Sequence, residues 1–184
     1  MPFVLTLIGE DKPGLVDSIS KVVAEHDGNW QESRMAHLGG HFAGIVRISV
    51  PEDRRDAIIE ALRALEDRGL TVVARPGQDQ PAPAAGRSAT LEIVGHDRPG
   101  IVRHLSHTLA AHGVNVEELT TECFSAPMSG EMLFRARAFL GIPADANVQK
   151  LRADLENLAE EMMVDLSLEE SVNDLAETRA GAKG

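Results

Sequence analysis

The chain is organised around a stretch that occurs twice, first as Val4-Leu-Thr-Leu-Ile-Gly-Glu-Asp-Lys-Pro-Gly-Leu-Val16 and again as Thr90-Leu-Glu-Ile-Val-Gly-His-Asp-Arg-Pro-Gly-Ile-Val102. The offset is 86 residues, measured from Gly9 to Gly95. A shared Gly-x-Asp-x-Pro-Gly with similar apolar neighbours is improbable by chance, and an internal repeat reveals how a chain is built. The sequence therefore predicts two copies of one module.

Each copy changes its hydrophobic period within this stretch. Residues 3–8 form a short β-prone run that ends at a glycine, which is typical of a strand. After Pro13 the apolar residues are spaced by three and four, which is typical of a helix. A proline in the first helical turn costs no hydrogen bond, because that N–H has no partner there. Residues 89–94 and Pro99 show the same change in the second copy.

The rest of each copy adds three strands and one helix. In the first copy we expect strands from about residue 29, over residues 42–48 and over 70–74, with a helix over 58–65 before the last strand. In the second copy we expect strands over residues 115–124, 132–142 and 162–168, and a helix over 148–158. The order β-α-β-β-α-β predicts an α+β fold of two ferredoxin-like βαββαβ sandwiches in tandem.

The domain organisation follows from where this pattern stops. We expect a first domain over residues 1–75 and a second over residues 89–170. Residues 76–88 contain three prolines with several alanines and glycines, which is typical of a linker. Residues 171–184 are small and polar, which predicts a flexible tail.

The composition excludes several classes of function. The formal net charge is −11, and affinity for phosphate backbones comes largely from lysine and arginine, so we expect no direct binding to nucleic acid. No apolar run approaches the ~20 residues of a membrane helix, and the first four residues lack the charged start of a signal peptide. A single cysteine, Cys123, favours a reducing compartment. We therefore expect a cytoplasmic protein that does not associate with membranes.

The turn between the first strand and the first helix is the place best suited to a ligand. The first N–H groups of a helix lack internal partners and lie at the positive end of its dipole, so they suit a carboxylate. Gly14 has no Cβ and would let a ligand approach the backbone, and Asp11 could receive an ammonium group. The alternative is that the aspartate caps the helix and the glycine serves only the turn. Binding is favoured because both copies keep Asp, Pro, Gly and a later Asn.

No group of residues in the sequence indicates catalysis. A nucleophile with its base and orienting group is absent, as is a Gly-rich phosphate loop. His96, His104, His107 and His112 lie near one helix and Cys123 follows them, but their spacing is not that of a zinc site. We therefore expect no catalytic residues, no metal and no cofactor, and we expect the histidines on a solvated helix surface.

The duplicated pattern resembles the ACT domain, a βαββαβ amino-acid-sensing module, over residues 3–75 and 89–169. The tandem arrangement is similar to the ACT repressors of the glycine cleavage system, as is the Pro-x-Ser-Gly loop within a six-residue insertion at residues 125–130. The resemblance implies a non-catalytic regulator that binds a small amino acid, glycine foremost, and controls a transcription-factor partner.

Two other functions remain open. The chain could be a regulatory subunit or fragment of an amino-acid or one-carbon enzyme, although it ends at Gly184 without a catalytic domain, which we expect to favour the regulator. It could also be an adaptor whose ligand sites are vestigial.

The resemblance also implies which residues contact the ligand. In ACT domains the effector lies at an interface between domains, held by the strand–helix turn of one domain and by polar groups of its partner. We place the asparagine that starts the second strand of each copy beside this turn. The implied ligand-binding residues are Asp11, Gly14, Leu15, Val16 and Asn29 in the first copy, and Asp97, Gly100, Ile101, Val102 and Asn115 in the second.

The predicted sheets lead to an expectation about assembly. In this fold both helices lie on one face of the sheet, yet residues 3–8 are apolar at nearly every position, as in a strand that is buried on both faces. An uncovered sheet of that composition would be a large apolar patch. We therefore expect the two copies to pack together and the chain to form a homodimer.

Overall fold

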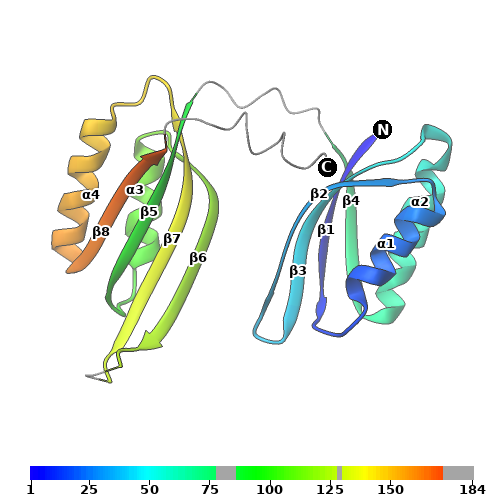
Figure 1. The fold of residues 1–184 in the computed structure, drawn as a ribbon, viewed down its shortest axis with the longest axis horizontal. Helices are drawn as coiled ribbons and strands as arrows, with labels where there is room; N and C mark the ends of the chain where they lie inside the picture. Colours follow the sequence, from blue (N-terminus) through cyan, green and yellow to red (C-terminus); the bar gives the residue numbers. More distant parts are fainter. Residues whose placement is uncertain (78–85, 128–129, 172–184) are drawn as a thin grey trace, which may run out of the picture. The chain divides into compact units, whose positions relative to one another are not determined.

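The computed structural model describes residues 1–77, 86–127 and 130–171 (Figure 1). The chain divides into two compact units, Met1–Gln80 and Pro81–Gly184, which are the two copies of the repeat. Each unit is a four-stranded antiparallel sheet with helices on one face. The prediction of two ferredoxin-like βαββαβ sandwiches in tandem is confirmed.

The first unit has the strand order β2-β3-β1-β4, so β1 lies in the interior of the sheet. Its helices bury one face of β1, β3 and β4. The elements are β1 (Pro2–Glu10), α1 (Leu15–Glu25), β2 (Asn29–Leu38), β3 (His41–Ser49), the 3-10 turn η1 (Glu52–Arg54), α2 (Arg55–Arg63), the 3-10 turn η2 (Ala64–Arg68) and β4 (Leu70–Pro76).

The second unit repeats this arrangement with the strand order β6-β7-β5-β8. His112 joins its two helices, since Nε2 of its ring lies 2.8 Å from Oδ2 of Asp154. The elements are β5 (Gly86–His96), α3 (Ile101–Ala111), β6 (Asn115–Ser125), β7 (Met132–Pro143), α4 (Val148–Met162) and β8 (Val164–Ser171). Among the described helices of both units, none is long and apolar enough to cross a membrane.

The strand β1 alternates between buried and exposed side chains. Phe3, Leu5 and Leu7 are buried beneath the helices, whereas Thr6 and Ile8 point to the other face and are exposed. Successive side chains of a strand point to opposite faces. Within one unit the helices therefore cover only one face of this strand, and the cover of the other face by a second copy stays a prediction.

Some element boundaries differ from those expected. β4 ends at Pro76 and β5 begins at Gly86, so both strands reach into the segment expected to be a linker, and residues 78–85 lie outside the described residues. α4 continues to Met162, and the last strand begins only at Val164, because the helical spacing of apolar residues extends to Met162. Residues 128–129 of the inserted loop and the expected tail from residue 172 also lie outside the described residues.

Candidate functional site

The turn between β1 and α1 exposes the first amides of the helix. Gly14 is the N-cap residue and has a φ of +91°, a left-handed conformation that glycine adopts at little cost. The N–H of Ser18 makes the first helical hydrogen bond, to the carbonyl oxygen of Gly14 at 2.9 Å. The N–H groups of residues 15–17 precede this bond and have no acceptor within the helix. They therefore form a small array of donors at the positive end of the α1 dipole.

The carboxylate of Asp11 lies exposed in the same turn. Its backbone N–H donates to the carbonyl oxygen of Gly40 at 2.9 Å, which fixes the turn against the β2–β3 hairpin. Within the described part of the chain, the carboxylate makes no hydrogen bond or ion pair. The helix cap is Gly14 rather than Asp11, so the first copy does not support the alternative in which the aspartate serves only as a cap.

The neighbouring charges of this turn neutralise each other. Nζ of Lys12 lies 2.6 Å from Oε2 of Glu10. This hydrogen bond and the charge of Lys12 lower the pKa of the Glu10 carboxyl below its usual value. Lys12 is therefore engaged by Glu10 and not by Asp11.

The turn between β5 and α3 has the same backbone but more crowded surroundings. Gly100 has a φ of +100°, and Nδ1 of His104 lies 2.9 Å from the Gly100 carbonyl oxygen, where the first copy has Ser18. The imidazole ring lies 3.3 Å from the position that a Cβ of residue 100 would take. Less room is therefore left for a ligand at the second turn than at the first.

Cys123 lies beside the second turn. Partial desolvation, followed by the charge of Asp97 and a hydrogen bond to its carboxylate, raises the pKa of the Cys123 thiol above its usual value. The thiolate is the nucleophilic form of cysteine, so a raised pKa makes this thiol a poor nucleophile at neutral pH. The Asp97 carboxylate already has one partner, which again distinguishes the second turn from the first.

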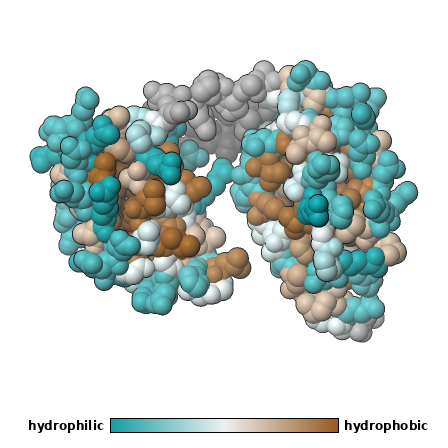
Figure 2. All heavy atoms as spheres, turned by 180° about the vertical axis from the view of Figure 1, so that it is seen from behind, coloured by the Kyte–Doolittle hydropathy of each residue, from teal (hydrophilic) through white to brown (hydrophobic). Residues whose placement is uncertain are grey.

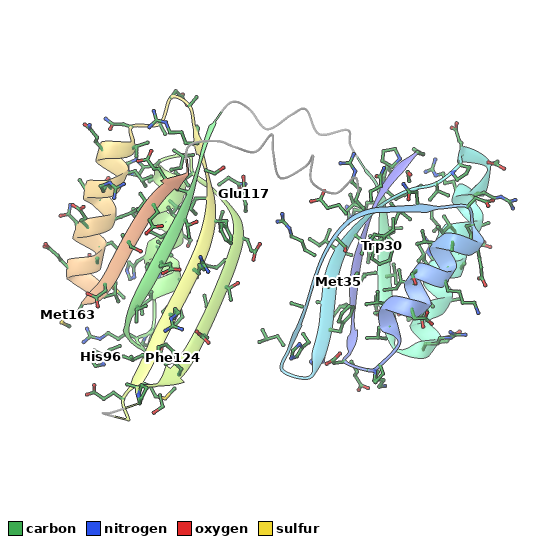
Figure 3. The ribbon with its side chains drawn as sticks, viewed as in Figure 1. Trp30, Met35, His96, Glu117, Phe124 and Met163 are labelled. Carbon is green, nitrogen blue, oxygen red and sulfur yellow. The ribbon has the colours of Figure 1, made fainter. Side chains whose placement is uncertain are left out.

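The two asparagines do not lie beside the turns, and the expectation that they do is wrong. Asn29 pairs with Ser49 at one end of the first sheet, whereas Leu38, at the far end of the same strand, pairs with His41 and lies near the turn. The nine residue steps from Asn29 to Leu38 span about 30 Å of extended strand. The second unit has the same separation, since Figure 3 shows Glu117, close to Asn115, and His96, close to Asp97, at opposite ends of the sheet.

The remaining implied residues differ in exposure. Leu15 and Ile101 are buried and anchor their helices on the sheet, while Val16 and Val102 are exposed next to the turns. Each turn therefore brings together an aspartate, a glycine and one exposed valine.

A shallow cavity of about 510 Å³ in the second unit was not expected from the sequence. It lies between the ends of β5, α4 and β8, where His96 and Met163 are seen in Figure 3. Its residues come from three separate parts of the chain, so no local motif indicates it. In the described residues of the whole chain, no three His, Cys, Asp or Glu side chains are grouped so that they could hold a metal ion.

The chain is similar to known regulatory proteins. The family model of the ACT domain matches residues 1–74 and 89–169. The glycine cleavage system transcriptional repressor of Escherichia coli (strain K12) is 25% identical over 172 residues, which are 92% of this chain and 88% of the repressor, and that of Shigella flexneri matches to the same extent. The crystal structure of an unknown protein from Galdieria sulphuraria superposes with a TM-score of 0.83 at 33% identity, covering 93% of this chain and 98% of that one.

Proposed function

Since the chain belongs to the ACT domain family, we propose that it is a non-catalytic cytoplasmic sensor of a small amino acid, glycine foremost, which controls a partner transcription factor of the glycine cleavage system. The similarity to the repressor of Escherichia coli along most of both chains supports this role.

The observation that carries the proposal is the pair of complementary charges in the first turn. An amino acid bears a carboxylate and an ammonium group one carbon apart. The free N–H groups of residues 15–17 suit the carboxylate, and the exposed carboxylate of Asp11 suits the ammonium group. The left-handed Gly14 leaves open space in front of these amides, since no atom lies within 4 Å of the position of a Cβ. A ligand with a small side chain or none fits this opening.

A second ACT copy completes the proposed site. Asn29 lies about 30 Å from the turn of its own unit along β2, so it cannot touch a ligand held there. The asparagine of a second chain can do so, and its side-chain amide can both donate to the ligand carboxylate and accept from the ammonium group. A ligand bound in this way stabilises one arrangement of the chains, which is how a small molecule alters the surface offered to a protein partner.

The proposal predicts that glycine stabilises the full chain against thermal unfolding. A ligand present at 100 times its Kd contributes about 2.7 kcal/mol to the free energy of unfolding. The variant Asp11→Asn keeps the shape of the side chain but removes its charge, and we expect it to weaken glycine binding at least about tenfold. The same exchange at Asp56, in the first turn of α2, is the control and leaves binding unchanged. If none of the common amino acids stabilises the chain, the sensor is excluded and the adaptor remains.

The protein alone is expected not to bind DNA at physiological salt. Its net charge is −11, and non-specific binding to DNA requires neutralisation of phosphates by basic residues. Gel-shift experiments with the promoter DNA of glycine cleavage genes from the source organism provide the measurement. A tight, salt-sensitive shift in the absence of any other protein would contradict control through a partner.

A further inference from the structure

We propose that two copies of this chain dimerise through the uncovered face of the first unit's sheet. This surface, the open face, is the side of the sheet opposite to α1 and α2. Apolar side chains are exposed on the first unit in Figure 2. The apolar residues of the open face are Val4, Ile8, Ala36, Leu38, Ala43, Ile45 and Val73, and two arginines, Arg34 and Arg47, lie among them.

The apolar residues of the open face form one continuous patch. Thr6 of β1 pairs with Ile45 on one side and with Val73 on the other, so these side chains lie in one row across the sheet. Ile8 pairs with Ala43 in the next row. Ile8, Ile45 and Val73 are 53%, 56% and 46% exposed. Large exposed apolar side chains in adjacent rows are typical of a surface that a partner covers.

The corresponding face of the second copy carries two ion pairs between neighbouring strands, and Phe139, 41% exposed, occupies the position of Arg47. Glu92 and Arg137, which occupy the positions of Thr6 and Ile45, form an ion pair of 3.1 Å. Glu122 and Arg135 form another ion pair of 2.8 Å.

In the first copy, Ala36 and Ala43 occupy the positions of this second pair. In the first copy, uncharged residues therefore occupy all four positions of these two ion pairs. A general property of the fold does not explain this difference, because the two copies share the fold.

The charges at the rim of the open face favour a second copy as the occupant. Glu32 on β2 and Arg75 on β4 lie at the two ends of one row, which crosses Arg47 and Val4. A two-fold axis parallel to the strands, between β1 and β3, lays β2 of one chain over β4 of the other. Glu32 then meets the partner's Arg75, and Arg75 meets the partner's Glu32.

The same axis brings apolar residues together in the centre. Ile45 lies over the partner's Thr6, and Ala43 lies over the partner's Ile8. At the opposite end of the face, Glu10 meets the partner's His41. An isologous two-fold interface requires this kind of self-complementarity. The residues proposed to hold the amino acid, which are Asp11, Gly14 and the amides of residues 15–17, lie outside the open face.

The test introduces an ion pair of the second copy at the corresponding positions of the first copy. The double variant Thr6→Glu with Ile45→Arg reproduces the pair Glu92–Arg137, which the same fold already accommodates. Light scattering without added amino acid is expected to give twice the chain mass of 19.8 kDa for the wild type and 19.8 kDa for the double variant. If the double variant does not fold, the single variant Val73→Lys, at an exposed position of β4, takes its place in the test. This variant is also expected to be a monomer.

The matched control reverses the pair in the second unit. The variant Glu92→Arg with Arg137→Glu keeps an ion pair and is expected to keep the wild-type mass. Circular dichroism of each variant verifies that its fold is intact. A wild-type chain that is monomeric at micromolar concentrations overturns the proposal. A folded open-face variant that retains the wild-type mass also overturns the proposal. In that case the chains associate through another surface, or a different partner covers this face.

Discussion

Replacing Gly9 by valine is expected to lower the free energy of unfolding by about 3 kcal/mol, because overpacking against backbone cannot be relieved by a side-chain rotation. Gly9 pairs with Leu70 where β1 meets β4. A Cβ at this position would overlap the carbonyl oxygen of Gly69 and would lie 3.3 Å from Cα of Leu70. The glycine that opens the repeated motif is therefore needed for the close approach of two strands, and not for a turn.

Urea denaturation followed by the fluorescence of Trp30 provides the measurement. Trp30 is the single tryptophan of the chain and packs against the core of the first unit, so its signal reports the unfolding of that unit. Ser33→Val, at an exposed position of β2 outside the open face, is the control and is expected to change the midpoint little. A Gly9→Val variant that unfolds at the wild-type urea concentration would show that the two strands do not approach as described.

Replacing Gly14 by alanine is expected to weaken glycine binding at least about tenfold, a loss of ~1.4 kcal/mol. The φ of Gly14 is +91°, and an L-residue in the left-handed region costs roughly 1–2 kcal/mol. The added methyl group would meet no atom within 4 Å, so it causes no clash. The turn relieves the strain by changing its backbone, which moves the N–H groups of residues 15–17 away from the ligand. Isothermal titration calorimetry of the full chain measures the loss.

The control for this variant carries a similar strain elsewhere. Gly113 has a φ of +68° in the turn between α3 and β6, which is at the opposite end of the second sheet from the β5–α3 turn. Gly113→Ala is expected to reduce stability to a similar extent and to leave glycine binding unchanged. If Gly14→Ala binds glycine as tightly as the wild type, the amides of the first helical turn do not hold the ligand.

The fold was predictable because its signals are local and are repeated. Strands of period two and helices of period three to four were readable in both copies, and the duplicated motif fixed the order of the elements. The position of Asn29 was not predicted correctly, although it follows α1 closely in the sequence. The helix carries the chain back to the end of the sheet where β1 begins, so β2 starts there and not at the turn. Proximity along the chain is misleading wherever a helix of full sheet length intervenes.

The difference between the two uncovered faces could also not be predicted from the sequence. The ion pair between Glu92 and Arg137 joins residues 45 positions apart, and only the strand register shows that Thr6 and Ile45 occupy the corresponding places. The contact of Cys123 with Asp97 likewise depends on β6 passing beside the second turn. Such contacts depend on the strand register, which brings together residues that are far apart in the sequence.

The amide resonances of the first helical turn test the central claim most directly. In a titration of the isotopically labelled full chain with glycine, followed by two-dimensional ¹H–¹⁵N NMR, we expect saturable shifts at a micromolar to millimolar Kd. The largest shifts are expected at the amides of Gly14, Leu15, Val16 and Asp17, which precede the first helical hydrogen bond. Spectra that do not change with any small amino acid, or shifts confined to residues away from both strand–helix turns, would contradict the account.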